Sequence, residues 1–173
     1  MLTKKMNDAL NAQINAEMWS AYLYLSMSVD AAAKGHKGVA NWFEVQFREE
    51  QDHARIIIGH VLSRGGEVKL APIDAVPTEW KSPLDAFKAT LTHEKKVTSL
   101  IHDLYAVAEK EKDYAALGML RWFVDEQVEE EENASDLIAS LERVGDDRLG
   151  LFLVDKELAA RTYSLPSPLA KKE

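Results

Sequence analysis

The chain contains no cysteine. Disulfides, thiolate metal sites, iron–sulfur clusters and a cysteine nucleophile are therefore excluded. Proline is scarce as well: the five prolines lie at positions 72, 77, 83, 166 and 168. Because proline interrupts helices, the two long proline-free stretches, residues 1–71 and 84–165, can each be helical apart from short turns.

Long apolar runs and an excess of positive charge are also missing. No stretch is long and apolar enough to span a bilayer, and the N-terminus leads into an amphipathic pattern rather than the apolar core of a signal peptide. The formal net charge of −8 argues against a nucleic-acid partner. At 173 residues the chain suits one domain. We therefore expect a cytoplasmic, single-domain protein that binds neither nucleic acid nor membrane.

Helical periodicity dominates the chain, without a convincing alternating strand pattern. Gly65 and Gly145 are typical of residues that end a helix, and Ser82 with Pro83 is typical of a helix start. The pattern predicts five helices, at residues 4–34, 39–64, 83–111, 114–144 and 147–160.

The lengths of the connections predict how these helices are arranged. The first and third connections are only a few residues long, so each should join an antiparallel pair. The middle connection, residues 67–81, can cover ~50 Å at ~3.3 Å per residue, which exceeds the ~40–45 Å length of the flanking helices. The sequence therefore predicts an all-α, up-down-down-up four-helix bundle over residues 4–144 with one long crossover. A short fifth helix and a tail at 161–173 follow the bundle.

Two triplets of potential metal ligands repeat with the same internal spacing. In each, the second and third residues follow the first by 33 and 36 positions. An i, i+3 pair shares a helix face, so each triplet can converge on a point between two helices. The triplets are Glu17, Glu50 and His53, and Glu94, Gln127 and Glu130.

Each of these side chains interrupts an otherwise apolar inward helix face. Counted from the two hairpin turns, all six lie in one layer ~5–8 Å thick at ~1.5 Å per residue. Buried carboxylates in one layer would repel one another and take up protons unless cations neutralise them. Ligands of this kind, without sulfur, favour iron or manganese over copper, with zinc as a competitor.

The segments that carry these residues resemble the ferritin family, specifically its prokaryotic non-haem members. The resemblance covers nearly the whole chain, including the crossover and the fifth helix. It is carried by residues 13–17 with Tyr24, residues 49–53, Glu94, residues 122–131 and residues 155–158.

The resemblance implies a di-iron centre in which Glu50 bridges two irons. The ligands implied for the first iron are Glu17, Glu50 and His53. Those implied for the second are Glu94 and Glu130, with Gln127 beside it.

The resemblance also implies a third iron position, made by Glu49, Glu126 and Glu129, with Glu130 shared. Tyr24 is implied as an electron donor or hydrogen-bond partner of the iron site, and a packed core tyrosine is the alternative. Other residues of the same kinds are interpreted as solvated, surface or packing residues: Glu131, Glu132, Trp122, His36, His60, His93 and His102.

Departures from related families narrow the prediction. Bacterioferritins carry a second E-x-x-H motif on the fourth helix, and their haem methionine follows the bridging glutamate; here these positions are Gln127-x-x-Glu130 and Gln51. Haem is therefore not expected, and a cysteine-free chain cannot carry the cysteine-ligated iron of rubrerythrins. Residues 115–120 contain no acid, so the acidic entry pore of animal ferritins is not expected.

The leading hypothesis is an iron-storing ferroxidase. It would oxidise Fe(II) with dioxygen or peroxide and deposit ferric mineral inside the hollow 24-subunit shell that the resemblance implies. A small di-iron enzyme acting on peroxide or an organic substrate is the first alternative. A non-catalytic helical scaffold or metal buffer is the second.

Overall fold

The computed structural model describes residues 2–170, and Met1 and residues 171–173 lie outside the described part, including the end of the predicted tail. Five helices form this part, and no strand occurs in it. All predicted starts and ends agree with the structure to within two residues; at the fifth helix Asp147 caps the N-terminus and residues 159–160 form a turn. The helices are α1 (Lys4–Ala33), α2 (Lys37–Ser63), α3 (Pro83–Glu111), α4 (Tyr114–Val144) and α5 (Arg148–Leu158).

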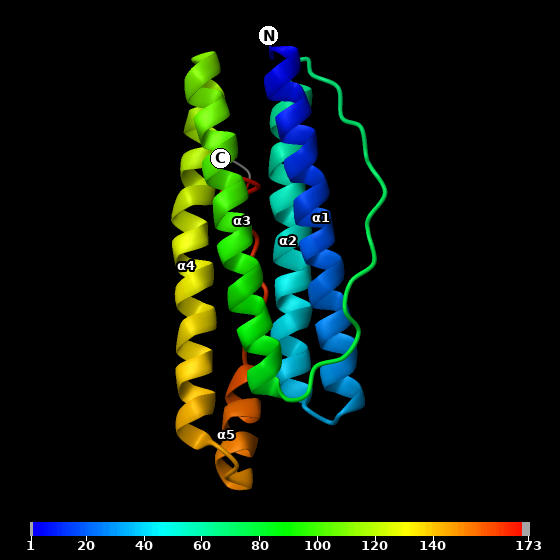
Figure 1. The fold of residues 1–173 in the computed structure, drawn as a ribbon, viewed down its shortest axis with the longest axis vertical. Coiled ribbons are helices and arrows are strands. Elements are labelled where there is room, and N and C mark those ends of the chain that lie inside the picture. Colours follow the sequence, from blue (N-terminus) through cyan, green and yellow to red (C-terminus); the bar gives the residue numbers. More distant parts are fainter. Residues whose placement is uncertain (1, 171–173) are drawn as a thin grey trace.

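The four long helices form a bundle with one long crossover (Figure 1). Short turns join α1 to α2 and α3 to α4, and residues 64–82 run the length of the bundle beside α1. This crossover makes α3 parallel to α2, which confirms the predicted up-down-down-up order. Within residues 2–170, no helix combines the length and apolar character needed to cross a membrane.

Helix ends follow the expected capping chemistry. The Ser82 hydroxyl accepts a hydrogen bond from the Asp85 amide at 3.1 Å, with Pro83 at the first position of α3. Gly65 and Gly145 have φ values of +70° and +57°, which an L side chain adopts only with strain. These residues end α2 and α4 where the sequence predicts.

The crossover is anchored along α1 by side chains of that helix. The Asn7 amide donates to the Glu67 carbonyl at 3.0 Å, and the Ser26 hydroxyl donates to the Pro77 carbonyl at 2.7 Å. Near its end the crossover buries Trp80 against the bundle. These contacts account for an ordered path without helical structure.

The apolar core is divided into two clusters by a polar layer. One cluster fills the end of the bundle near Met6, Ile57 and Leu120, and the other fills the end near Met27 and Phe87. Along every long helix the predicted ligand positions fall between these clusters. The bundle therefore interrupts its own core at one level with polar side chains.

The short helix α5 packs against the start of α2 and against α4. The Asp155 carboxylate accepts hydrogen bonds from the amides of Gly38 and Val39 at 2.9 and 3.0 Å, so α5 caps the N-terminus of α2. A Cβ atom on Gly38 would lie 1.5 Å from the Asp155 carbonyl oxygen. The contact therefore requires glycine at position 38.

Substituting Gly38→Ala is expected to displace α5 and to destabilise the protein by about 1–3 kcal/mol, because the added methyl group cannot share space with backbone. Gly59→Ala is the matched control on the same helix, since a Cβ there meets nothing within 4 Å and alanine favours helix by ~1 kcal/mol. Melting temperatures and tryptic cleavage at Lys156 measure the two effects. Equal melting temperatures for both variants would contradict the close contact.

Candidate metal centre

Glu17, Glu50 and His53 meet in the polar layer. Glu17 projects from α1, while Glu50 and His53 lie one helical turn apart on α2. One potential ligand atom from each lies within 4.8 Å of the other two. All three side chains are buried, at 1–2% exposure. The structure thus brings together the first predicted triplet.

Each residue of this triplet carries an unsatisfied polar atom. Among residues 2–170, Glu17 Oε2, Glu50 Oε2 and His53 Nε2 have no hydrogen-bond partner. The other Glu17 oxygen accepts from the Gln13 amide at 2.8 Å, which orients the carboxylate. Unpaired buried polar atoms are costly, and oxygen and imidazole nitrogen are suitable ligands for iron, manganese or zinc. The donor set therefore fits a divalent cation.

The second triplet lies in the same layer but is hydrogen-bonded. Glu94 accepts from the Tyr24 hydroxyl and, at 3.2 Å, from the Gln127 amide. Glu130 accepts from the Gln46 amide at 2.8 Å. Tyr24 is thus a hydrogen-bond partner of Glu94, one of the two roles that the resemblance implies. The side-chain amide nitrogen of Gln127 points toward Glu94.

The carboxylates of the layer strongly resist ionisation. Burial, and then the charge of Glu50, raise the pKa of Glu17 to about 8. Burial followed by the charge of Glu94 raises the pKa values of Glu50 and Glu130 well above the usual range. Burial is also the main cause of the raised pKa of Glu94. Without a cation, the layer holds protons that a divalent ion would displace.

A further acidic cluster lies beside this layer. His53 Nε2 is 4.0 Å from Glu126 Oε1. Burial raises the pKa values of Glu49 and Glu126, and Glu129 is exposed. Glu49 is also paired with Arg161, which the spacing patterns do not identify.

Two polar partners of the site, Gln46 and Arg161, were not predicted from the sequence. Gln46 could have been found, because it lies one turn before Glu50 on the same helix face. Arg161 could not, because it comes from beyond α5. Glu132 is exposed as predicted. Glu131 is half-buried and accepts a hydrogen bond from Thr98 at 2.6 Å.

Trp122 and His93 pack against neighbouring side chains, whereas His102 lies at the surface. Trp122 packs edge-on against the His53 ring, with centroids 5.5 Å apart. His93 is half-buried with its Nε2 atom 2.8 Å from the Ser20 hydroxyl oxygen. His102 is exposed. The prediction that these residues serve packing or the surface agrees with these contacts.

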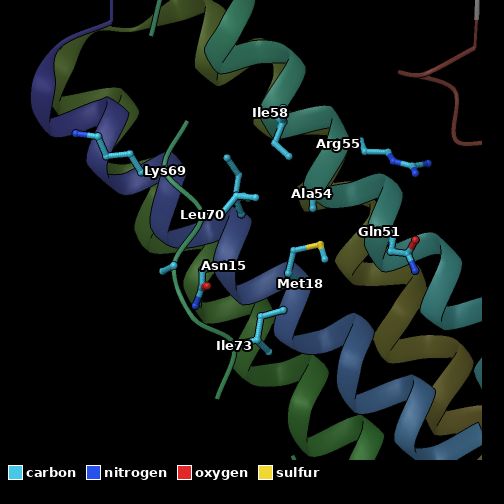
Figure 2. A pocket seen from close by; sticks show the side chains of 11 residues that line it. Asn15, Met18, Gln51, Ala54, Arg55, Ile58, Lys69, Leu70 and Ile73 are labelled. Atoms are coloured by element: carbon cyan, nitrogen blue, oxygen red, sulfur yellow. The ribbon is translucent and has the colours of Figure 1, made fainter. Parts of the chain in front are cut away.

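An apolar pocket of about 340 Å³ lies outside the polar layer, between α1, α2 and the crossover. Met18 from α1, Ile58 from α2 and Leu70 from the crossover face a common space in Figure 2. Gln51 also lines it, at the position where bacterioferritins have their haem methionine. Neither Glu50 nor His53 lines the pocket, so it does not give a substrate access to the triplet.

Residues 7–144 match the family model described as "Ferritin-like domain". The chain belongs to the ferritin family. A bacterial non-heme ferritin of Bacteroides fragilis is 42% identical over 161 residues, which cover 93% of this chain and 100% of that protein. Family membership supports iron storage as the general role of this chain.

Solved archaeal ferritins share the fold closely. A structure described as a novel open pore ferritin from Archaeoglobus fulgidus has a TM-score of 0.92 and 47% identity, covering 94% of this chain and 100% of that one. A form of the Archaeoglobus fulgidus ferritin closed by site-directed mutagenesis has a TM-score of 0.93 and 46% identity, covering 95% and 100%. The predicted fold is therefore confirmed by comparison as well as by the helices themselves.

Proposed function

We propose that the protein is a ferroxidase that stores iron. The observation that carries this proposal is the buried triplet of Glu17, Glu50 and His53. One potential ligand atom from each lies within 4.8 Å of the other two, and each residue also has a buried polar atom without a hydrogen-bond partner. Iron is substrate and cargo here rather than a permanent cofactor. Haem has no part in the proposal.

The proposed chemistry begins with displacement of protons from the layer by Fe(II). Glu17, Glu50 and His53 would bind one ion, and Glu94 and Glu130 a second, with Glu50 between them and Gln127 beside the second. Each Fe(II) gives one electron to dioxygen or peroxide, and carboxylates stabilise the higher charge of the Fe(III) product. Tyr24 holds Glu94 in place through its hydroxyl.

A third iron position is proposed at Glu49, Glu126 and Glu129, with Glu130 shared. The 4.0 Å approach of Glu126 to the unpaired His53 nitrogen supports a link between this cluster and the first triplet.

Storage requires a container, which one bundle cannot supply. We infer a hollow homo-oligomeric shell, a 24-mer, located in the cytoplasm. The support is family membership together with an exposed apolar face on α5, where Leu149, Phe152 and Leu153 are 56–65% exposed. Large apolar side chains exposed together are typical of protein contact surfaces.

Iron loading followed by size separation tests the proposal. After Fe(II) is added in air in a several-hundred-fold excess per assembly, iron is expected to stay soluble and to co-elute with a particle far larger than one chain. Oxidation with precipitation free of protein would instead favour a small di-iron enzyme. Oxidation no faster than in protein-free buffer would leave only a scaffold or metal buffer.

A further inference from the structure

The segment after α5 folds back along α2, as the red trace in Figure 1 shows. The Asn41 amide donates to the carbonyl oxygens of Leu158 and Arg161 at 3.2 and 2.9 Å. Farther along, the Tyr163 hydroxyl donates to the buried carboxylate of Asp52. These contacts hold Arg161 against α2 beside the polar layer.

Arg161 is held on several sides. Its guanidinium donates to Glu49 Oε2 at 2.5 Å, to Gln46 Oε1 at 2.9 Å and to the Trp42 carbonyl at 3.2 Å. It also lies 4.4 Å from the centroid of the Trp42 ring. Its side chain is only 22% exposed. A guanidinium in such contacts is a fixed positive charge, because arginine keeps its proton in proteins.

Gln46 lies between the Arg161 guanidinium and the Glu130 carboxylate and is hydrogen-bonded to both. Its side chain is fully buried, its oxygen accepts from Arg161, and its amide nitrogen donates to Glu130 at 2.8 Å. A glutamine amide whose oxygen is engaged by a cation must present its nitrogen elsewhere. Arg161 thereby fixes the orientation in which Gln46 donates to Glu130.

Glu49 belongs to the acidic cluster and is also the carboxylate that binds the Arg161 guanidinium. Arg161 and His53 oppose the rise in the pKa of Glu49 caused by burial, whereas Glu126 and Glu129 add to it. The guanidinium is bonded to a carboxylate that a third ion would use. The unpaired, buried His53 nitrogen faces the same cluster through Glu126.

We propose that Arg161 is a positioning residue that occupies Glu49 in place of a metal ion and must be displaced when a third divalent ion binds. The inference rests on the proposed function, because it concerns the order in which iron fills that site. With Arg161 in place, the two ions of the di-iron centre bind first. A third ion competes with the guanidinium for Glu49, and its binding releases the segment that carries Arg161.

Calorimetric titration of the assembled apoprotein with Zn²⁺, which is redox-inert, tests this competition. In Arg161→Gln, the third ion per subunit is expected to bind roughly tenfold more tightly than in the wild type, because one charge-assisted hydrogen bond no longer has to be broken. Arg161→Lys keeps the charge, and its third ion should bind with near-wild-type affinity. Tyr163→Phe loosens the same segment but leaves the guanidinium on Glu49, so it should tighten the third ion by less than Arg161→Gln does.

Tighter binding of the third ion in Arg161→Gln is a result that a mere loss of structure would not produce. Third-ion binding in Arg161→Gln that is equal to or weaker than in the wild type would overturn the inference, as would equal tightening in Tyr163→Phe. Wild-type protein that binds no Zn²⁺ at Glu17, Glu50 and His53 would instead overturn the proposed function, and the inference with it.

A second measurement uses the wild type alone and so does not depend on how the variants fold. Hydrogen exchange in residues 159–165 is expected to stay constant while the first two Zn²⁺ ions bind and to increase when the third binds. Exchange that stays constant through the third ion would show that Arg161 is not displaced.

Discussion

Replacing Glu50 and His53 together by alanine is expected to slow Fe(II) oxidation by at least ~100-fold, since changes to ligands and their partners commonly cost 10–100-fold in metal affinity or activity. Both side chains belong to the buried triplet, and Glu50 is the proposed bridge to the second ion. The metal-free double variant should also melt at a higher temperature than the parent, because a buried carboxylate next to Glu17 and Glu94 is removed. Stopped-flow absorbance in air and thermal melting measure the two effects.

The matched control for this variant is Glu44→Ala with Arg48→Ala, an exposed or half-exposed ion pair on the same helix. Its oxidation rate should equal that of the wild type. Unchanged oxidation in the Glu50 and His53 double variant would disprove the proposed site, whatever its stability.

The second large effect concerns the stability of the metal-free protein, which is expected to fall as the pH rises from about 4.5 to about 8. In this window the unfolded chain loses the Glu17 proton while the folded chain keeps it, since the folded pKa is raised from 4.5 to about 8. The stabilisation is complete below the unfolded pKa and is lost as the pH approaches the folded pKa. Glu17 alone accounts for at most ~5 kcal/mol across this window, at ~1.36 kcal/mol per pKa unit.

Glu50, Glu94 and Glu130 shift in the same direction, so they add to the slope. Urea midpoints measured between pH 5 and pH 8, with and without Zn²⁺, test the prediction. Saturating Zn²⁺ should flatten the dependence, because the ion replaces the protons, and Glu17→Gln should flatten it in part. A metal-free protein that becomes more stable between pH 5 and pH 8 would contradict the assigned burial of these carboxylates.

The fold and the centre of the site could be predicted because both leave periodic signals. Apolar residues recur at helical spacing along the chain. The two helical hairpins also place their ligands at equal separations, because the pair that follows Glu17 and the pair that follows Glu94 lie the same number of positions away. Gly65 and Gly145 end helices for a local steric reason that sequence reveals. The parallel arrangement of α2 and α3 could be predicted because the connection between them is long enough to span the bundle. The assignment of the residues as iron ligands remains a prediction.

The contacts of Arg161 could not be predicted in the same way. Arg161 lies 112 positions from Glu49, in a segment without helical periodicity, and its position depends on how α5 docks on α2. The hydrogen bond from Thr98 to Glu131 likewise depends on the packing of α3 against α4. Such pairings arise from tertiary packing between segments, which neither spacing nor propensity encodes.

The division of the apolar core by the polar layer has a consequence for cooperativity. Met6, Leu10 and Ile57 at one end of the bundle and Phe43, Phe87 and Met27 at the other belong to separate clusters, so each end can open without exposing the apolar contacts of the other. Local unfolding follows such contiguous units. An ion held by Glu17 on α1 and by Glu50 and His53 on α2 would cross-link the chain at the boundary between the two units. A metal ion bound there would therefore also stabilise the folded subunit, and the metal-loaded protein would resist partial unfolding better than the metal-free protein.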